Sequence, residues 1–281
     1  MRLIQCILTE NDCYKTNQWI KPKGVMLHST GANNPTLKRY VQPLETDANY
    51  NELISILGYN RNHNDWNRPG TNACVHAFIG KFADGSIGTA QTLPWNMRGW
   101  HAGNGTTRPS ANNTHISFEI CEDDLTDPDY FAKVYKEAVE LTAYLCQMYN
   151  LNPLQDEVVI CHNEGYHLGM ASGHADVTHW FPKFGKTMDD FRADVKAQMD
   201  EGVEEEVTQE QFDAMMDDWL TRRSLEKPSG WSQSSRQWAE QNGIIKGVGD
   251  IDGDGQNDFS YKSFITREET IVMLDRMQNG V

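Results

Sequence analysis

One stretch, residues 159–186, limits the fold and function of this chain more than any other. It begins with a short apolar, β-prone run at residues 159–161. It then breaks into glycines and other small residues, interspersed with histidines and Asp176. The histidines are His162, His167, His174 and His179. Such a segment is too polar for a core and too patterned for a spacer. It predicts a loop that leaves a strand and contributes ligands to a metal ion.

A loop supplies only part of a zinc site, so another ligand must come from elsewhere in the chain. A catalytic zinc ion takes three protein ligands and leaves one position for water. His28 is the best candidate because it ends the apolar run 24–28, which predicts a buried strand that delivers it to the rim of a sheet. We therefore predict His28 and His162 as the first two ligands, although either histidine alone is more often an ordinary polar residue.

The charge of the chain argues against one large class of function. Its 281 residues carry a formal net charge of -15, and its lysines and arginines are scattered rather than gathered in a stripe. A protein that holds nucleic acid by neutralising phosphates needs the opposite balance. We therefore expect no nucleic-acid partner.

The sequence also carries signals about compartment. No apolar run approaches the roughly 18 to 20 residues that cross a bilayer, and residues 1–10 are too soon interrupted for a secretory signal. We expect synthesis in the cytoplasm, without a signal peptide and without membrane insertion. A domain of this size in such a compartment does not need disulfides. Free, mostly buried thiols are therefore predicted at Cys6, Cys13, Cys74, Cys121, Cys146 and Cys161.

The order of the elements predicts an α/β fold with a mixed central sheet flanked by helices. Asp84 and Gly85 separate two β-prone runs within residues 74–91, which predicts a hairpin. Residues 115–122 predict a central strand. Residues 126–150 predict a long helix whose apolar side chains recur at helical spacing. Strands that alternate with helices in this way favour a mixed sheet with helices packed against it.

Composition divides the chain into two domains. The acidic run at residues 201–207 has little to bury and predicts a linker. We predict a catalytic domain over residues 1–200 and a small, mainly helical domain over residues 208–281. In the second domain, capping-box patterns at residues 208–211 and 266–269 predict helix starts.

Five short motifs follow one another along the first domain. They lie at residues 25–30, at residues 75–79 with Asp84 and Gly85, and at residues 100–103, 113–119 and 162–176. Together they resemble the type 2 N-acetylmuramoyl-L-alanine amidases, zinc enzymes related to phage lysozyme-type amidases and peptidoglycan recognition proteins. The resemblance covers roughly residues 20–195. It implies a zinc cofactor and hydrolysis of the amide bond between N-acetylmuramic acid and L-alanine in peptidoglycan.

The resemblance also implies the third metal ligand. In the family this ligand is an aspartate or cysteine that usually precedes a proline, with a lysine two places before it. This chain has Asp176 followed by Val177, and His174 in the place of the lysine. We predict Asp176 as the third ligand, with His174 and His179 as alternatives.

Glu119 is the predicted general base, since members of the family carry a carboxylate on the matching strand. A glutamate in the apolar middle of a strand needs a function or a partner, because burying an unpaired charge is costly. The alternative is therefore a structural ion pair with an arginine. His174, in place of the lysine, is expected to donate to the oxyanion when it is protonated.

Four further residues are predicted to contact the substrate. They are His76, Trp100, His101 and His179. The tryptophan would stack on sugar or peptide, although tryptophans are also ordinary core residues. His76 and His101 are equally compatible with a structural role.

The second domain contains two weaker patterns. Its aspartates match the first part of a calcium loop, with Tyr261 in the place of the closing glutamate, so an acidic turn is the alternative. These residues are Asp250, Asp252, Asp254 and Asp258. Residues 238–247, 264–269 and 274–276 resemble a single S-layer homology unit, a type of module that attaches proteins to cell walls.

These features predict a modular amidase that acts as an endolysin of a phage or prophage in a Gram-positive host. It would be made in the cytoplasm and reach the wall on release, with peptidoglycan and a cell-wall polymer as its partners. Two other classes stay open. One is a non-catalytic peptidoglycan-binding protein of the same fold. The other is a metal-dependent nuclease, suggested by the histidine- and asparagine-rich loop around His63 and opposed by the acidic charge.

Overall fold

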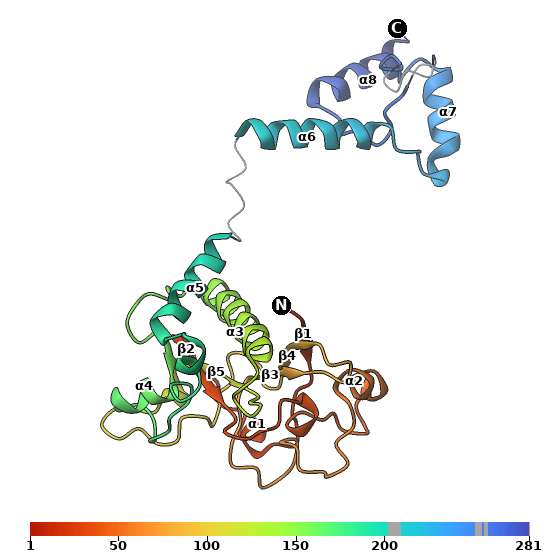
Figure 1. The fold of residues 1–281 in the computed structure, drawn as a ribbon. Helices are drawn as coiled ribbons and strands as arrows, with labels where there is room; N and C mark the ends of the chain where they lie inside the picture. Colours follow the sequence, from red (N-terminus) through yellow and green to blue (C-terminus); the bar gives the residue numbers. More distant parts are fainter. Residues whose placement is uncertain (202–208, 251–254, 256–257, 281) are drawn as a thin grey trace. The chain divides into compact units, whose positions relative to one another are not determined.

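The computed structural model describes residues 1–201, 209–250, 255 and 258–280. Contacts divide the chain into two compact units, Met1–Val203 and Glu204–Val281 (Figure 1). The predicted linker lies outside the described residues, apart from Glu201. No described helix combines the length and the apolar character that a membrane span requires.

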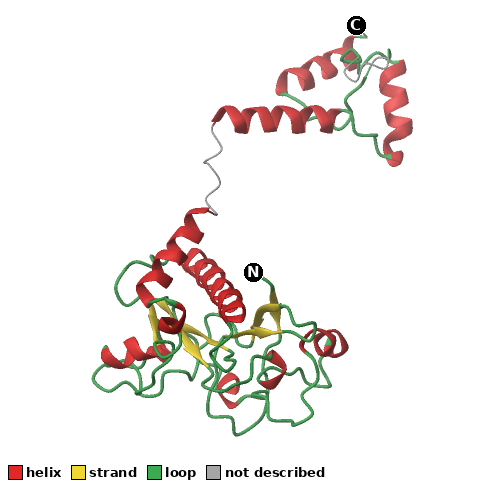
Figure 2. Cartoon of the chain, in the orientation of Figure 1, coloured by secondary structure: helices red, strands yellow, loops and turns green. Residues whose placement is uncertain are grey.

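The first unit is built on a mixed β-sheet, as predicted (Figure 2). Among the described residues the sheet has six strands in the order β1-β4-β3-β5-β2-β6. The strands are β1 (Leu3–Gln5), β2 (Gly24–Ser29), β3 (Ala77–Lys81), β4 (Ile87–Gln91), β5 (His115–Ile120) and β6 (Val159–Cys161).

Five α-helices and three short 3-10 helices of the first unit surround this sheet in the described part of the chain. They are α1 (Asp12–Lys15), η1 (Leu37–Arg39), α2 (Tyr50–Leu57), η2 (Ala111–Asn113), α3 (Pro128–Tyr149), α4 (His162–His167), η3 (Phe181–Phe184) and α5 (Met188–Glu201).

One strand pair is antiparallel, and the other four neighbouring pairs are parallel. The antiparallel pair, β3 and β4, is the predicted hairpin, and its turn contains Asp84 and Gly85. Gly85 has φ +81°, a conformation that glycine adopts without steric cost. The parallel strands β2 and β5 pair His28 with Glu119. Side chains of paired residues lie on the same face of a sheet, so this register brings the two side chains together.

The long helix α3 covers one face of the sheet, and its sequence explains its limits. The Asp127 side chain accepts hydrogen bonds from the first backbone N–H groups, Pro128 occupies the first turn, and Asn150 ends the helix in the left-handed conformation. Its apolar face packs with α5 and with β-strand side chains such as Leu27 and Phe118 in the main core. The predicted long helix is therefore confirmed as a core element.

The opposite face of the sheet is polar at its centre. Because strand side chains alternate, the residues next to Leu27 and Phe118 point away from α3. These neighbours include His28 and Glu119, together with Met26, which packs in a separate small cluster with Ile160. The predicted metal ligand His28 and the predicted base Glu119 therefore lie on the face that α3 leaves uncovered.

The prediction about cysteines is wrong for one pair. Cys13 and Cys74 form a disulfide, with Cα atoms 6.3 Å apart and a sequence separation of 61. The prediction was based on the expected cellular compartment, which gives no information about the distance between two thiols in the fold. The remaining cysteines are free and buried, as predicted: Cys6, Cys121, Cys146 and Cys161.

The second unit is helical in its described residues. Its elements are α6 (Gln209–Ser224), η4 (Gly230–Ser232), α7 (Gln233–Gln241) and α8 (Arg267–Asn279). The capping box that starts α8 is confirmed, because the Thr266 side chain accepts from the Glu269 N–H and the Glu269 side chain accepts from the Thr266 N–H. The other predicted capping box begins at Thr208, which lies outside the described residues.

Candidate active site and metal centre

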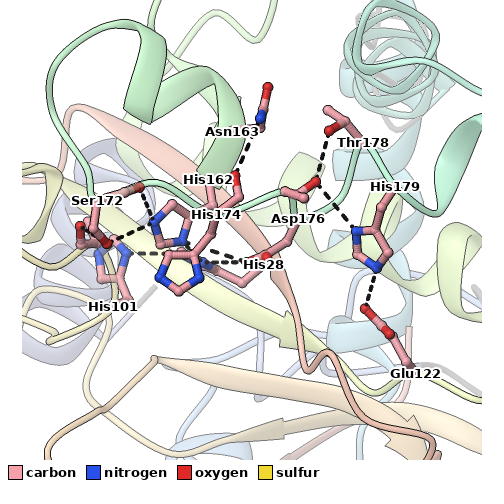
Figure 3. Close-up of polar contacts among 12 residues, drawn as sticks. His28, His101, Glu122, His162, Asn163, Ser172, His174, Asp176, Thr178 and His179 are labelled. Carbon is pink, nitrogen blue, oxygen red and sulfur yellow. Dashed lines mark hydrogen bonds and ion pairs between the residues drawn. The ribbon is translucent and has the colours of Figure 1, made fainter.

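His28 lies near the carboxyl end of β2, on the sheet face opposite α3. Its side chain is 1% exposed, so both ring nitrogens depend on protein partners or on a ligand. The Nε2 atom lies 3.0 Å from Nδ1 of His101. The Nδ1 atom faces His162 and Asp176, and the three side chains converge (Figure 3).

His162 reaches the same point from the neighbouring strand. It directly follows β6 and is the first residue of α4. Arg192 donates to the backbone oxygen of Val159 in β6, and Glu164 accepts from the backbone N–H of Cys161. These contacts hold the end of the strand in place. The Nδ1 atom of His162 is 3.0 Å from Nδ1 of His28.

Asp176 completes the group from the loop after α4. Its Oδ2 atom lies 3.5 Å from Nδ1 of His28 and 3.6 Å from Nδ1 of His162. Asn163 anchors this loop, since its backbone N–H donates to the backbone carbonyl oxygen of Asp176 and its side-chain amide donates to the backbone carbonyl oxygen of His174. Because Asn163 follows His162 directly, the same segment positions two of the three groups.

The donor atoms of this group fit a metal ion. Nε2 of His162 lies 3.0 Å from the Ser172 carbonyl oxygen, which can only accept, so Nε2 carries the proton and Nδ1 a lone pair. Burial, followed by the neighbouring His28, lowers the pKa of His162 to about 4, so the ring stays neutral at pH 7. A lone pair and a carboxylate oxygen that face one another call for a cation.

The spacing of the three atoms suits zinc. Ligand atoms at about 2.0–2.1 Å from a tetrahedral zinc ion lie about 3.3 Å from one another. The three separations in the structure, 3.0, 3.5 and 3.6 Å, bracket that value. Within the described residues, one set of at least three histidine, cysteine or carboxylate side chains has ligand atoms that all lie within 4.8 Å of one another. This set is His28, His162 and Asp176.

Glu119 lies in the same cleft as the candidate metal ligands and has no arginine partner. Its Oε2 atom is buried and has no hydrogen-bond donor within the described residues. Burial, followed by the negative charges of Asp176 and Glu122, raises the pKa of Glu119 well above its usual range. A carboxyl group that holds a proton readily and has an uncommitted oxygen suits proton transfer.

These groups open into a cleft of about 450 Å³. Its lining includes the three ligand residues, Glu119, Trp100, His101 and His174. His174 is exposed, and its ring centre lies 4.5 Å from that of His162. The structure therefore places His174 at the mouth of the site, where it can meet a substrate. Trp100 also lines this cleft, as a stacking role requires.

A larger hollow of about 660 Å³, lined by residues 154–157 and by residues of β6, α4 and α5, lacks the converging group of metal-binding atoms. The charged groups that line it include Arg192, Glu164 and Asp189, and Arg192 is paired with both carboxylates. The smaller cleft is therefore the better candidate for catalysis.

His76 does not reach the cleft, which corrects its predicted role in substrate binding. It is fully buried. Its Nδ1 accepts from the backbone N–H of Ser117 at 2.9 Å, and its Nε2 donates to the Met97 carbonyl oxygen at 2.8 Å. Both ring nitrogens are thus used inside the protein, and His76 serves the fold.

His179 has neither of the two roles predicted for it, which were substrate contact and, as an alternative to Asp176, metal ligation. Its Nε2 lies 2.9 Å from Oε1 of Glu122, and its Nδ1 faces the Ala175 carbonyl oxygen at 3.4 Å (Figure 3). It does not line the cleft. His179 instead ties the loop that carries Asp176 to the segment that follows β5.

His101 lines the cleft, but neither ring nitrogen is free for a substrate. Nδ1 faces His28, and Nε2 lies 3.2 Å from the His115 carbonyl oxygen. Burial, followed by the neighbouring His28, lowers the pKa of His101 well below its usual value. Sequence reasoning missed the contact with His28, because 73 residues separate the two.

The predicted calcium loop is described only in part. Asp252 and Asp254 lie outside the described residues. Oδ2 of Asp250 accepts from the Gly255 backbone N–H at 2.9 Å, and Asp258 pairs through its backbone with Gly249. These are contacts of a turn, and calcium stays a prediction.

Comparison with known families gives one match. Residues 18–183, more than half of the chain, match the family described as N-acetylmuramoyl-L-alanine amidase. The matched segment contains the candidate metal centre, Glu119 and the whole cleft. No curated protein matches the sequence significantly.

Several solved structures are similar to the first unit. Staphylococcus aureus hydrolase AmiA, in complex with its ligand, is 17% identical with a TM-score of 0.49, over 71% of this chain and 83% of AmiA. The PlyG catalytic domain is 20% identical with a TM-score of 0.46, over 71% and 96%. A mutant endolysin from Bacillus subtilis is 24% identical with a TM-score of 0.43, over 69% and 99%.

Proposed function

Because this chain belongs to the N-acetylmuramoyl-L-alanine amidase family, we propose that it is a zinc-dependent peptidoglycan amidase whose metal is held by His28, His162 and Asp176. The enzyme class is that of hydrolases that cleave the amide bond between N-acetylmuramic acid and L-alanine. The zinc dependence, the residues and the biological setting are the parts that we propose.

The observation that carries the proposal is the convergence of three metal-binding atoms. Two imidazole nitrogens and one carboxylate oxygen lie 3.0–3.6 Å apart at the floor of the cleft. They come from β2, from the start of α4 and from the loop after it, which the fold brings together. Three protein ligands beside an open cleft are the arrangement of catalytic rather than structural zinc sites.

Zinc at this place would supply Lewis acidity, which polarises the amide carbonyl and makes water easier to deprotonate. Glu119 has the position and the uncommitted Oε2 atom to accept the proton of the attacking water. It can then pass this proton to the amide nitrogen, which leaves as the amino group of L-alanine. His174, at the cleft mouth, would donate a hydrogen bond to the developing oxyanion when it is protonated.

Purified full-length protein tests this proposal directly. We expect about one zinc ion per chain by elemental analysis, and release of stem peptides with free L-alanine amino groups from purified peptidoglycan. A chelator should abolish the release and added zinc should restore it. Cleavage by metal-free protein that is indifferent to chelators would overturn the proposal. His63→Ala is the matched control, because His63 is exposed and does not line the cleft.

We further propose that the protein acts as an endolysin of a phage or prophage in a Gram-positive host. It would be made in the cytoplasm and would reach the wall on release. Expression in a Gram-positive host tests this setting. Lysis should require co-expression of a membrane-permeabilising holin and should fail with His28→Ala. Lysis without the holin would indicate an exported enzyme instead.

The second unit is proposed to attach the enzyme to a cell-wall polymer, as its resemblance to a single S-layer homology unit implies. Trp231 is 88% exposed, Phe264 70% and Trp238 53%. Exposed aromatic rings of this kind suit stacking on sugars. Co-sedimentation of the full chain with walls, with calcium or with a calcium chelator, tests both attachment and the calcium loop. Trp231→Ala should weaken sedimentation, whereas Trp19→Ala in the first unit should not.

A further inference from the structure

His101 joins the metal centre to the interior through two consecutive contacts. Its Nδ1 lies 3.0 Å from Nε2 of His28, and its Nε2 lies 3.2 Å from the carbonyl oxygen of His115. The chain of contacts therefore runs from His28, through the His101 ring, to a backbone carbonyl of β5.

Hydrogen-bond chemistry gives this chain one direction. A carbonyl oxygen only accepts, so Nε2 of His101 is the donor toward His115. The Nδ1 atom of the neutral ring then carries a lone pair and accepts. Its partner, Nε2 of His28, must be the donor, which leaves the lone pair of His28 on Nδ1. That atom is the one that faces His162 and Asp176.

We propose that His101 is a positioning residue that fixes the tautomer and ring orientation of His28, so that Nδ1 of His28 is held ready for the metal ion. This inference rests on the proposed zinc site and departs from the substrate-binding role predicted for His101. A ring whose two nitrogens are both engaged by the protein has no polar atom left for a substrate.

The surroundings of His101 keep it in place without a ligand. Asn112 is 5% exposed, and its Oδ1 accepts from the backbone N–H groups of His101 and Ala102 at 2.8 and 2.9 Å. Its amide donates to the Gly103 carbonyl oxygen. Trp100, on the other side, pairs with Cys74 through an isolated β-bridge. The loop that carries His101 is therefore held from both ends.

The two ligand histidines are positioned by the same principle with different acceptors. His162 donates through Nε2 to the Ser172 carbonyl oxygen, and His28 donates through Nε2 to the His101 ring. Outer hydrogen bonds of this kind set the tautomer of metal-bound histidines. The acceptor for His28 is a side chain, so it can be changed by mutation.

Two substitutions separate this role from simple packing. In His101→Asn, the amide oxygen can occupy the place of Nδ1 and accept from His28. In His101→Leu, the volume is similar but the acceptor is lost. Melting of the zinc-free proteins serves as the folding check, and His63→Leu is the control for an exposed histidine outside the cleft.

The first readout needs no metal. Long-range ¹H–¹⁵N spectra of the zinc-free full chain report which nitrogen of His28 carries the proton. We expect the Nε2–H form of His28 in the wild type and in His101→Asn, and a mixture of tautomers in His101→Leu. An unchanged His28 tautomer in His101→Leu would overturn the inference, even if the wild type binds no zinc.

The second readout is zinc affinity, measured by competition with a chromogenic chelator. Loss of an outer partner weakens metal binding about 10- to 100-fold, and we expect this loss in His101→Leu. His101→Asn should recover most of the affinity. Equal weakening in both variants would show that the ring matters only as packing and would overturn the inference. Wild-type protein that has the expected tautomer but binds no zinc would refute the proposed cofactor alone.

Discussion

Two groups of histidines share the polar face of the central sheet, and they differ at a single ring nitrogen. His76 and His115 have a protein partner on each nitrogen. For His115, Nε2 lies 2.9 Å from the Glu157 carbonyl oxygen, and Nδ1 lies 2.9 Å from the Thr114 hydroxyl. His28 and His162 have such a partner on Nε2, whereas their Nδ1 atoms face each other.

The difference indicates which buried histidines in this fold are suited to bind a metal ion. Burial does not distinguish the two groups of histidines, since His76 and His28 are equally hidden from solvent, at 0% and 1% exposure. The distinguishing feature is a second ring nitrogen that faces another imidazole nitrogen and a carboxylate instead of a backbone group or a hydroxyl. Four substitutions test this distinction.

The largest effect is expected for His28→Ala, which removes one converging nitrogen. Zinc affinity should fall by more than the roughly 10- to 100-fold that outer partners cost, and peptide release should fall to the level of chelator-treated wild type. Elemental analysis and peptidoglycan digestion measure both. If the variant still binds one zinc ion per chain, His28 is not a metal ligand and has a structural role like that of His76.

Glu119→Gln should separate proton transfer from metal binding. The amide has nearly the shape of the carboxylate but cannot accept the proton, so kcat should drop about 10²- to 10⁴-fold. Zinc content should stay unchanged, because Glu119 is not one of the three converging groups. If zinc is lost as well, Glu119 is part of the metal centre rather than its neighbour.

His76→Gln should sharpen the structural side of the comparison. Burial lowers the pKa of His76 from 6.5 to about 4. Between those two pH values the unfolded chain binds a proton that folded His76 refuses, so stability falls as pH falls. The difference corresponds to about 3 kcal/mol. Denaturant unfolding of zinc-free protein from pH 7 to pH 4 should therefore show a flatter pH dependence in the variant. An unchanged slope would mean that His76 takes up its proton in the folded state.

The smallest effect is expected for His179→Ala. It leaves the carboxylate of Glu122, which is 5% exposed, without its partner at 2.9 Å. A cost of about 1–3 kcal/mol in the free energy of unfolding follows from the lost hydrogen bond. Zinc stoichiometry should persist, as thermal melting and elemental analysis can show. Loss of the ion would make His179 a ligand in place of Asp176.

Local patterns in the sequence were sufficient for much of the architecture. The helix over residues 128–149 follows from apolar spacing and an aspartate–proline start, and the hairpin follows from an Asp-Gly turn. The proximity of His28 and His162 also follows, because both were predicted at the ends of strands. The approach of Asp176 depended on a family resemblance rather than on spacing.

The errors concern contacts between segments that are distant in sequence. The partners of His76 and His101 lie tens of residues away, and so do Cys13 and Cys74. Nothing in the local sequence distinguishes a histidine that faces a cleft from one enclosed by backbone groups. Only the folded arrangement decides where each ring nitrogen points.

The pairing of His28 with Glu119 across β2 and β5 limits how this enzyme can be redesigned. Inserting or deleting one residue within either strand would reverse the alternation beyond that point. The proposed ligand His28 or the proposed base Glu119 would then turn into the apolar layer beneath α3. Loops around the cleft can be lengthened or exchanged to alter substrate preference, but the number of residues in these two strands must stay constant.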